Sequence, residues 1–334
     1  MSEALGTLDA PVLVLADLDG TRPTDPALEL VAAARTLTGG DVVVLALGPV
    51  EAEASAALAA AGANRLLVAD LGGERAQAAA GADAVVAAVH EVAPGAVLVS
   101  SDYRGKETAG RAAVLLDSAC VSDVADLRVV DGALHADRLV LSGSWSTTMS
   151  ANAHTVHPPI LAVRPGSVEV PDASVDDAAP LPAVALEAAV SPEAAAVRLV
   201  SRESTAAAAG PDLAGARTVV VGGRGVDGDF DLVRSLAEPL GAAVGATRVA
   251  CDEEWIERSA QIGQTGVSIA PRLYIGLGVS GAIHHTSGIQ GAGTIVAVCD
   301  DSEAPIFEMA DFGVVGDVTE VVPQLVAELD RLRG

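Results

Sequence analysis

The sequence of 334 residues is poor in aromatic and basic residues. Aromatic side chains make up 2% of the chain, so a flat ring ligand would have to be held mainly by arginine and backbone. Lys106 is the only lysine, and 20 basic residues stand against 45 acidic ones, which gives a formal net charge of −25. Such a charge repels polyanions, which argues against nucleic acid and anionic membranes as partners.

Cysteine and long apolar segments are also scarce. Cys120, Cys251 and Cys299 lie far apart and form no CxxC pair, which argues against a metal site or a disulfide framework and suits a reducing cytosol. The first ten residues hold two acids and no base, unlike a secretory leader. Two uncharged stretches, 139–163 and 273–299, carry histidine together with proline or glycine, so neither should enter a membrane. We therefore expect a cytoplasmic protein without metal or membrane insertion.

The first half of the chain alternates short β-branched runs with alanine-rich stretches. Apolar strands separated by helices of this length are typical of βαβ units in a parallel sheet covered on both faces. Polar strand-like segments around Asp131 and Gly132 indicate an added antiparallel hairpin. The predicted strands are residues 12–16, 42–47, 66–68 and 97–100, the predicted helices are 26–37, 51–61, 82–91 and 104–116, and the hairpin joins 127–130 to 138–141.

The composition changes in the middle of the chain. Residues 166–211 are punctuated by prolines and rich in alanine, serine and acidic residues, which predicts a connector with a short helix after Pro192. Buried strands resume at residue 218. The sequence therefore predicts an α/β protein with two doubly wound domains, an N-terminal one at 1–165 and a C-terminal one at 212–334 with a Rossmann-like parallel sheet.

Two glycine-rich turns in the second half could hold a phosphate. A strand at 218–221 runs into the sequence GGRG at 222–225, ahead of a helix at 230–240, so backbone N–H groups and Arg224 could bind an anion there. The simpler interpretation is a tight turn with a surface arginine. A second strand at 273–275 leads into a GxGxxG spacing. Asp300 follows about 20 residues later, as in a dinucleotide fingerprint, although chance matches are common in a chain with 34 glycines.

Other polar residues lie between and after these turns. Thr247 and Arg248 come first, and Gln264 and Thr265 follow in the run IGQTG. The neighbouring pair His284 and His285 lacks a suitably spaced carboxylate or cysteine, which argues against a metal. His285 could equally be a structural histidine that bonds to the backbone.

These motifs together resemble electron transfer flavoprotein α subunits. The likeness covers nearly all of residues 218–329 and is specific, because several motifs occur in order, whereas residues 100–117 match more loosely. The stretches that carry it are GGRG (222–225), GATR (245–248), GQTG (263–266), LYIGLGVSGAIHH (273–285), EAPIFEMADFGVVGD (303–317) and VVP (321–323).

The resemblance implies FAD in the C-terminal domain and a heterodimer with a β subunit that contacts the N-terminal domain. The chain would be a carrier rather than an enzyme. It would accept electrons from flavin dehydrogenases of the acyl-CoA dehydrogenase type and pass them to an acceptor such as a quinone oxidoreductase. Fatty acid β-oxidation is the setting that the family suggests.

The resemblance also implies a set of FAD-binding residues. Three positions depart from what many relatives carry: Cys299 for Asn, His284 for Gln, and Val267 for Lys. The diphosphate would be held by Arg224, Ser280 and Gly281, and the adenosine end would meet Cys299, Asp317 and Val318. The isoalloxazine would lie by Thr247 and Arg248, and its N5 edge would be lined by Ile262, Gly263, Gln264 and Thr265, with the Thr265 hydroxyl bonding there. The side of N1 and the C2 carbonyl would be approached by Ala282, Ile283, His284 and His285.

In this interpretation Arg248 and His285 stabilise an anionic flavin semiquinone by charge and hydrogen bonding. A helix starting near Gly281 would add the positive end of its dipole. Two other functions stay open: an NAD-dependent dehydrogenase that uses the GxGxxG turn, and a nucleotide-binding scaffold without redox chemistry. A flavin-bifurcating variant of the same family is a further alternative.

Overall fold

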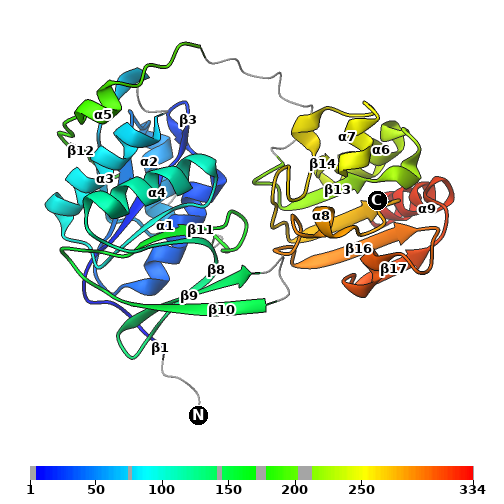
Figure 1. The fold of residues 1–334 in the computed structure, drawn as a ribbon, viewed down its shortest axis with the longest axis horizontal. Helices are drawn as coiled ribbons and strands as arrows, with labels where there is room; N and C mark the ends of the chain where they lie inside the picture. Colours follow the sequence, from blue (N-terminus) through cyan, green and yellow to red (C-terminus); the bar gives the residue numbers. More distant parts are fainter. Residues whose placement is uncertain (1–4, 74–76, 141–144, 171–177, 202–212, 334) are drawn as a thin grey trace. The chain divides into compact units, whose positions relative to one another are not determined.

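The computed structural model describes residues 5–73, 77–140, 145–170, 178–201 and 213–333. These residues belong to two compact units, which Figure 1 shows as ribbons. The first unit takes the described residues up to Ser201, and the second takes those from Leu213 onward. No helix among the described residues combines the length and the apolar character needed to cross a bilayer.

The first unit is built on a mixed sheet with the strand order β10-β9-β8-β11-β7-β2-β5-β6-β12, and β1 pairs with β8. A two-stranded hairpin of β3 (Leu18–Asp19) and β4 (Arg22–Pro23) stands apart from it. The sheet contains β1 (Leu5–Gly6), β2 (Val12–Ala16), β5 (Val42–Ala46), β6 (Arg65–Val68), β7 (Ala96–Ser100), β8 (Cys120–Val130), β9 (Ala133–Val140), β10 (Trp145–Asn152), β11 (Ile160–Val163) and β12 (Ala183–Ala185). The helices are α1 (Asp25–Leu37), α2 (Ala52–Ala60), α3 (Ala78–Val92), α4 (Tyr103–Leu115) and α5 (Pro192–Ala195).

Helices cover both faces of the parallel part of this sheet. Strands β2, β5 and β7 are buried along their whole length, which is why their sequences are continuously apolar. Successive residues of β2 face opposite sides: Val12 and Val14 join the core with α1, whereas Leu13 and Leu15 join the core with α3 and α4. The predicted parallel sheet with two covered faces is confirmed.

The predicted strands of the first unit do not include β1, β3, β4, β10, β11 or β12. Strand β10 pairs antiparallel with β9 along its whole length, yet most of its residues are exposed, so it shows no alternation of apolar and polar residues. Strand β12 pairs in parallel with β6 inside the segment 166–211. That segment, predicted as a connector, therefore also completes an edge of the first sheet. Its three strand residues are all exposed and left no pattern to detect.

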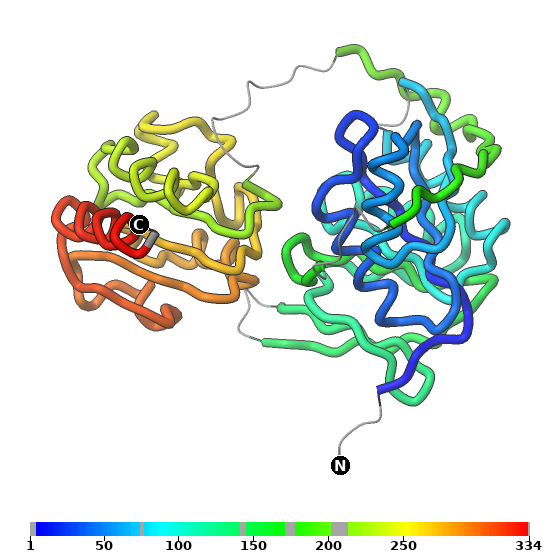
Figure 2. Tube along the Cα trace, turned by 180° about the vertical axis from the view of Figure 1, so that it is seen from behind, coloured from blue at the N-terminus to red at the C-terminus, as the bar shows by residue number. Residues whose placement is uncertain are grey.

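The second unit is a sheet of five strands in the order β14-β13-β15-β16-β17, and every neighbouring pair is parallel. Helices α6 and α9 pack beside each other in this unit, as Figures 1 and 2 both show. The strands are β13 (Thr218–Gly222), β14 (Ala243–Ala246), β15 (Leu273–Leu277), β16 (Thr294–Cys299) and β17 (Phe312–Val315). The helices are α6 (Phe230–Leu240), α7 (Arg248–Asp252), α8 (Ile283–Thr286) and α9 (Val318–Arg333), and short 3₁₀ turns are η3 (Arg224–Val226), η4 (Arg258–Ala260) and η5 (Pro305–Glu308).

The strand order of the second unit reverses between two particular strands. After β13 the chain moves to one side of it with β14, and then crosses to the other side with β15. In doubly wound sheets, ligands bind at the carboxyl ends of the strands where the order reverses in this way. The ends of β13 and β15 are therefore the first place to look for a ligand site.

Candidate functional site

The residues predicted to bind a cofactor gather at the carboxyl edge of the second sheet. Because the five strands are parallel, their carboxyl ends lie along one edge. Arg224 follows β13, Arg248 follows β14, Ser280 follows β15, Cys299 ends β16, and Asp317 follows β17. Thr247, Gly281 and Val318 are sequence neighbours of Arg248, Ser280 and Asp317. The other predicted residues lie in two segments that come after β14 and β15, at 262–265 and 282–285.

The two glycine turns of this edge are in direct contact. The Gly225 N–H donates to the Gly278 carbonyl at 3.0 Å, and the Gly223 N–H donates to the Leu277 carbonyl at 2.9 Å. A Cβ at Gly223 would stand 2.3 Å from the Gly278 oxygen, so no side chain fits there. The exposed Arg224 guanidinium makes no ion pair with a described residue. This edge thus combines close-packed backbone with an uncommitted cation, which suits a phosphate.

The segment 261–267 is bound to the segment that contains α8. The Gln264 N–H donates to the His284 carbonyl at 2.7 Å, and the Ile269 N–H donates to the Gly288 carbonyl at 2.8 Å. The His284 Nδ1 lies 2.7 Å from the Gln264 Oε1, so the two side chains also bond. The predicted N5-edge residues and the predicted C2-carbonyl residues therefore form one connected surface.

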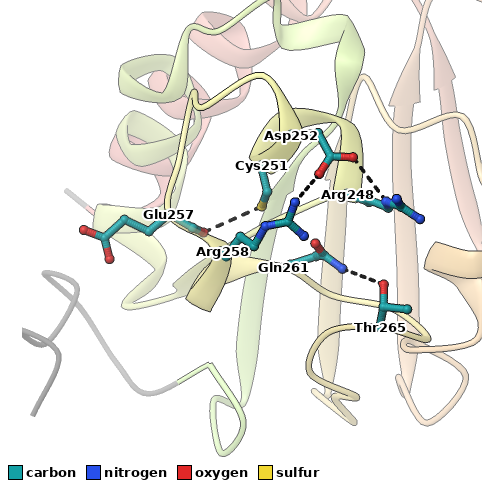
Figure 3. Close-up of polar contacts among 7 residues, drawn as sticks. All are labelled: Arg248, Cys251, Asp252, Glu257, Arg258, Gln261 and Thr265. Atoms are coloured by element: carbon teal, nitrogen blue, oxygen red, sulfur yellow. Dashed lines mark hydrogen bonds and ion pairs between the residues drawn. The ribbon is translucent and has the colours of Figure 1, made fainter. Parts of the chain in front are cut away.

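Two arginines share one carboxylate beside this surface, as Figure 3 shows. The Arg248 Nε lies 3.1 Å from Asp252 Oδ2, and the Arg258 Nη2 lies 2.6 Å from Asp252 Oδ1. The group keeps one net positive charge. Because the Arg248 side chain is 63% exposed, its ion pair adds little to folding stability, but it restricts where the guanidinium can go.

Among the described residues of the second unit, two polar residues are buried: Gln261, 3% exposed, and His285, 5% exposed. Gln261 was missed by the sequence analysis, because its side chain acts on a residue four positions away in an irregular loop. Its Nε2 donates to the Thr265 Oγ1 at 2.9 Å (Figure 3). Thr265 itself is exposed.

His285 points into the core and bonds through both ring nitrogens. Its Nδ1 lies 3.1 Å from the Ile262 carbonyl, which can only accept, so Nδ1 carries the proton. Its Nε2 then accepts from the Tyr274 hydroxyl at 2.8 Å. Burial lowers the pKa of His285 to about 4, which keeps the ring neutral. The structural role considered for His285 is the one seen here, and the predicted hydrogen bond to a flavin carbonyl would require one of these bonds to break.

The helix predicted to start near Gly281 is a single turn. Helix α8 covers four residues, Ile283–Thr286, and is followed by turns. The expected contribution of a helix dipole at this place is therefore wrong, because a dipole of useful size needs a longer run of aligned peptides. The same shortness weakens the dinucleotide interpretation of GxGxxG, which requires the glycines to open a helix.

The predicted adenosine-end residues are spread over the last two strands. Cys299 is buried, with its Sγ 3.9 Å from Asp300 Oδ1. Asp317 accepts from the Thr319 N–H at 2.8 Å and from its hydroxyl at 2.7 Å, and these bonds lower the pKa of Asp317. Val318 is buried. Asp317 thus has a structural role at the start of α9, which is separate from its predicted contact with adenosine.

Comparison with known proteins gives the same family for both halves of the chain. Residues 212–290 match the family model of the electron transfer flavoprotein FAD-binding domain, and residues 12–191 match that of the electron transfer flavoprotein domain. The chain is 39% identical over 309 residues to electron transfer flavoprotein subunit alpha of Mycobacterium leprae, which covers 92% of this chain and 94% of that protein. The proteins of the same name from Mycobacterium tuberculosis and Bacillus subtilis are 38% and 34% identical, covering 97% and 96% of this chain and 100% and 98% of theirs.

The carboxyl edge of the second sheet has the chemistry that FAD requires. Arg224 follows β13 and is exposed, so its guanidinium can neutralise a diphosphate at this edge. Arg248 and the exposed Gln264, Thr265 and Ser280 supply donors for a polar ring edge. The residues present therefore fit the cofactor.

His285 should stay neutral well below the pH at which an exposed histidine titrates. Burial lowers its pKa from 6.5 to about 4, and the unfolded chain takes up the proton first. The His285 contribution to the free energy of unfolding is therefore complete above about pH 6.5 and is lost as the pH falls toward 4. In an NMR titration, the ring resonance that His285→Gln removes should keep its neutral position down to about pH 5. A midpoint near 6.5 would contradict the buried arrangement.

Proposed function

We propose that this chain is the FAD-holding subunit of an electron carrier. The chain belongs to the electron transfer flavoprotein α-subunit family and carries its FAD-binding domain. It would take electrons from flavin dehydrogenases, those of the acyl-CoA dehydrogenase type among them, and pass them to an acceptor such as a quinone oxidoreductase. The observation that carries this proposal is the convergence of the predicted FAD-binding residues on one sheet edge.

The proposed contacts follow that edge from strand to strand. Arg224 with the turn at Ser280 and Gly281 would hold the diphosphate. Thr247 and Arg248 would lie against the isoalloxazine, the segment 262–265 would line its N5 edge, and the segment 282–285 would face N1 and the C2 carbonyl. Cys299, Asp317 and Val318 would meet the adenosine. The bonds between segments 262–265 and 282–285 support this assignment, since they hold both proposed flavin edges in one fixed surface.

The positive charge at this edge comes from arginine and not from the buried His285. When bound, FAD supplies the redox chemistry, and the protein's part is to bind it and to favour one of its charge states. Arg248 and Arg258, with Asp252 between them, would favour the anionic flavin that a single electron produces. His285 is neutral and would act through the backbone of Ile262, because its ring bonds hold that segment against Tyr274.

We also propose that a β subunit covers the outer side of the site. The rim of the proposed pocket is open in this chain: Arg248, Gln264, Thr265 and His284 are exposed, and the apolar Ile283 is 64% exposed. An exposed isoleucine within a polar rim is a feature that a partner chain would bury. A β subunit would therefore add the missing wall and complete the heterodimer.

Copurification tests the proposed function directly. The chain should be coexpressed with a β-type subunit encoded in the same genome, and the purified complex should show a flavin absorption spectrum with FAD released on denaturation. Stepwise reduction should pass through a one-electron anionic form of the flavin. A folded heterodimer without flavin, or with a bound nicotinamide nucleotide in its place, would overturn the proposal.

Gly223→Ala should reduce FAD retention. The new Cβ would stand 2.3 Å from the Gly278 oxygen and so force the two glycine turns apart, at a cost of about 1–3 kcal/mol. The FAD content per protein after gel filtration measures the effect. Gly110→Ala is the matched control, because a Cβ at Gly110 meets nothing within 4 Å. Equal FAD content in both variants would show that the contact of the turns does not matter for binding.

A further inference from the structure

We propose that Gln261 is a positioning residue that sets the direction in which the Thr265 hydroxyl donates its hydrogen bond. The inference rests on the proposed function, since it concerns the proposed N5 edge of the FAD site. Gln261 follows η4 and is one of the two buried polar residues described in the second unit. Figure 3 shows its amide turned toward Thr265.

The backbone holds Gln261 in place from both sides. Its N–H donates to the Arg258 carbonyl at 3.1 Å, and its carbonyl accepts from the Val267 N–H at 2.8 Å. Gly266 packs closely against Gln261, because a Cβ at Gly266 would stand 2.1 Å from the backbone carbonyl oxygen of Gln261 and 3.1 Å from its Cγ. With little freedom left, the amide can act as a fixed reference for the exposed hydroxyl of Thr265.

The chemistry of the two groups determines the direction of the bond. A side-chain NH₂ can only donate, and a threonine hydroxyl has one hydrogen and two lone pairs. When the Thr265 oxygen accepts from Gln261 Nε2 at 2.9 Å, its hydrogen is left free to point away from the amide. Thr265 then presents a donor toward the ligand side. With the amide turned round, Thr265 would donate inward and present only an acceptor.

A fixed hydrogen-bond donor at the N5 edge favours those states of the flavin in which N5 carries no proton. N5 of oxidised flavin accepts a hydrogen bond, and so does N5 of the anion formed by adding one electron and no proton. Once N5 is protonated it becomes a donor, so the bond that Thr265 donates to it is lost and only the second lone pair of the hydroxyl is left to accept from N5. Gln261 would therefore favour the one-electron anion over the N5-protonated forms, through the orientation of Thr265.

The test compares two substitutions of Gln261 in the FAD-loaded α/β complex. In Gln261→Glu, measured at a pH at which the carboxyl is ionised, the group only accepts, so Thr265 must donate to it and the direction reverses. Gln261→Met keeps the volume and removes the bond. We expect the fraction of one-electron anion at half reduction, expressed as its formation constant, to fall by about tenfold in Gln261→Glu and by less in Gln261→Met. The N5-protonated one-electron form should become visible at long wavelength in Gln261→Glu.

A double-mutant cycle separates orientation from a general packing effect. If Gln261 acts through the hydroxyl, Gln261→Met should change the formation constant in the wild type but not in a Thr265→Val background. Gln324→Glu, an exposed amide on α9, is the matched control and should leave the constant unchanged. Should the carboxylate of Gln261→Glu prevent folding, the cycle with Gln261→Met decides alone.

The outcomes distinguish this inference from the proposed function. A wild-type complex that lacks FAD would overturn both. A complex that binds FAD, with the same formation constant in wild type, Gln261→Glu and Gln261→Met, would overturn the role of Gln261 alone. Equal effects of Gln261→Met with and without the Thr265 hydroxyl would show a packing role and would also overturn the inference.

Discussion

The second unit depends on one close approach, the contact between the glycine turns that follow β13 and β15. The Gly225 N–H bonds to the Gly278 carbonyl, and a Cβ on Gly278 would lie 2.5 Å from the Gly225 Cα. The contact lies where the strand order reverses, which is the place where doubly wound sheets bind their ligands, and it fixes the spacing of the two turns there. Arg224 and Ser280 lie at the same edge because β13 and β15 are parallel, and the contact of the two turns holds the segments that carry them together.

Local sequence patterns predicted most of what is local in the structure. Helix α6 has the bounds that its sequence predicts, and β2, β5, β7, β13 and β15 lie within two residues of expectation, because continuous apolar runs leave few alternatives. The buried strands β11 and β14 were not predicted. The sequence patterns also failed for strands that are stabilised by backbone pairing with a neighbouring strand and not by burial of apolar side chains. Strand β12 has no apolar residue that is buried, and it forms only because β6 offers a free edge. The inward ring of His285 depends on Ile262, 23 residues away, which no periodicity reveals.

The distribution of charge explains how a strongly acidic chain can hold an anionic cofactor. The net charge of −25 belongs to the whole sequence, whereas Arg224, Arg248 and Arg258 lie near the carboxyl ends of β13 and β14, where Asp252 bonds to two of them. Asp300 and Asp317 follow β16 and β17, at the other end of the same edge. Local potential, and not net charge, governs binding within a Debye length of about 8–10 Å. Burial lowers the pKa of His285 to about 4, so its ring adds no charge to this edge in the range where imidazoles usually titrate.

The two buried polar residues of the described second unit share a physical role. His285 accepts a hydrogen bond from Tyr274 and donates one to Ile262, and Gln261 donates one to Thr265. Each of these buried side chains therefore fixes a part of the irregular loop at 261–267. Burying such groups is costly unless their bonds are made, and that cost selects one arrangement of the loop over others. A loop held in this way can present a donor in a fixed direction without an ionisable group. For a proposed carrier of electrons, a fixed donor has an advantage over an acid, because it can stabilise negative charge without giving up a proton.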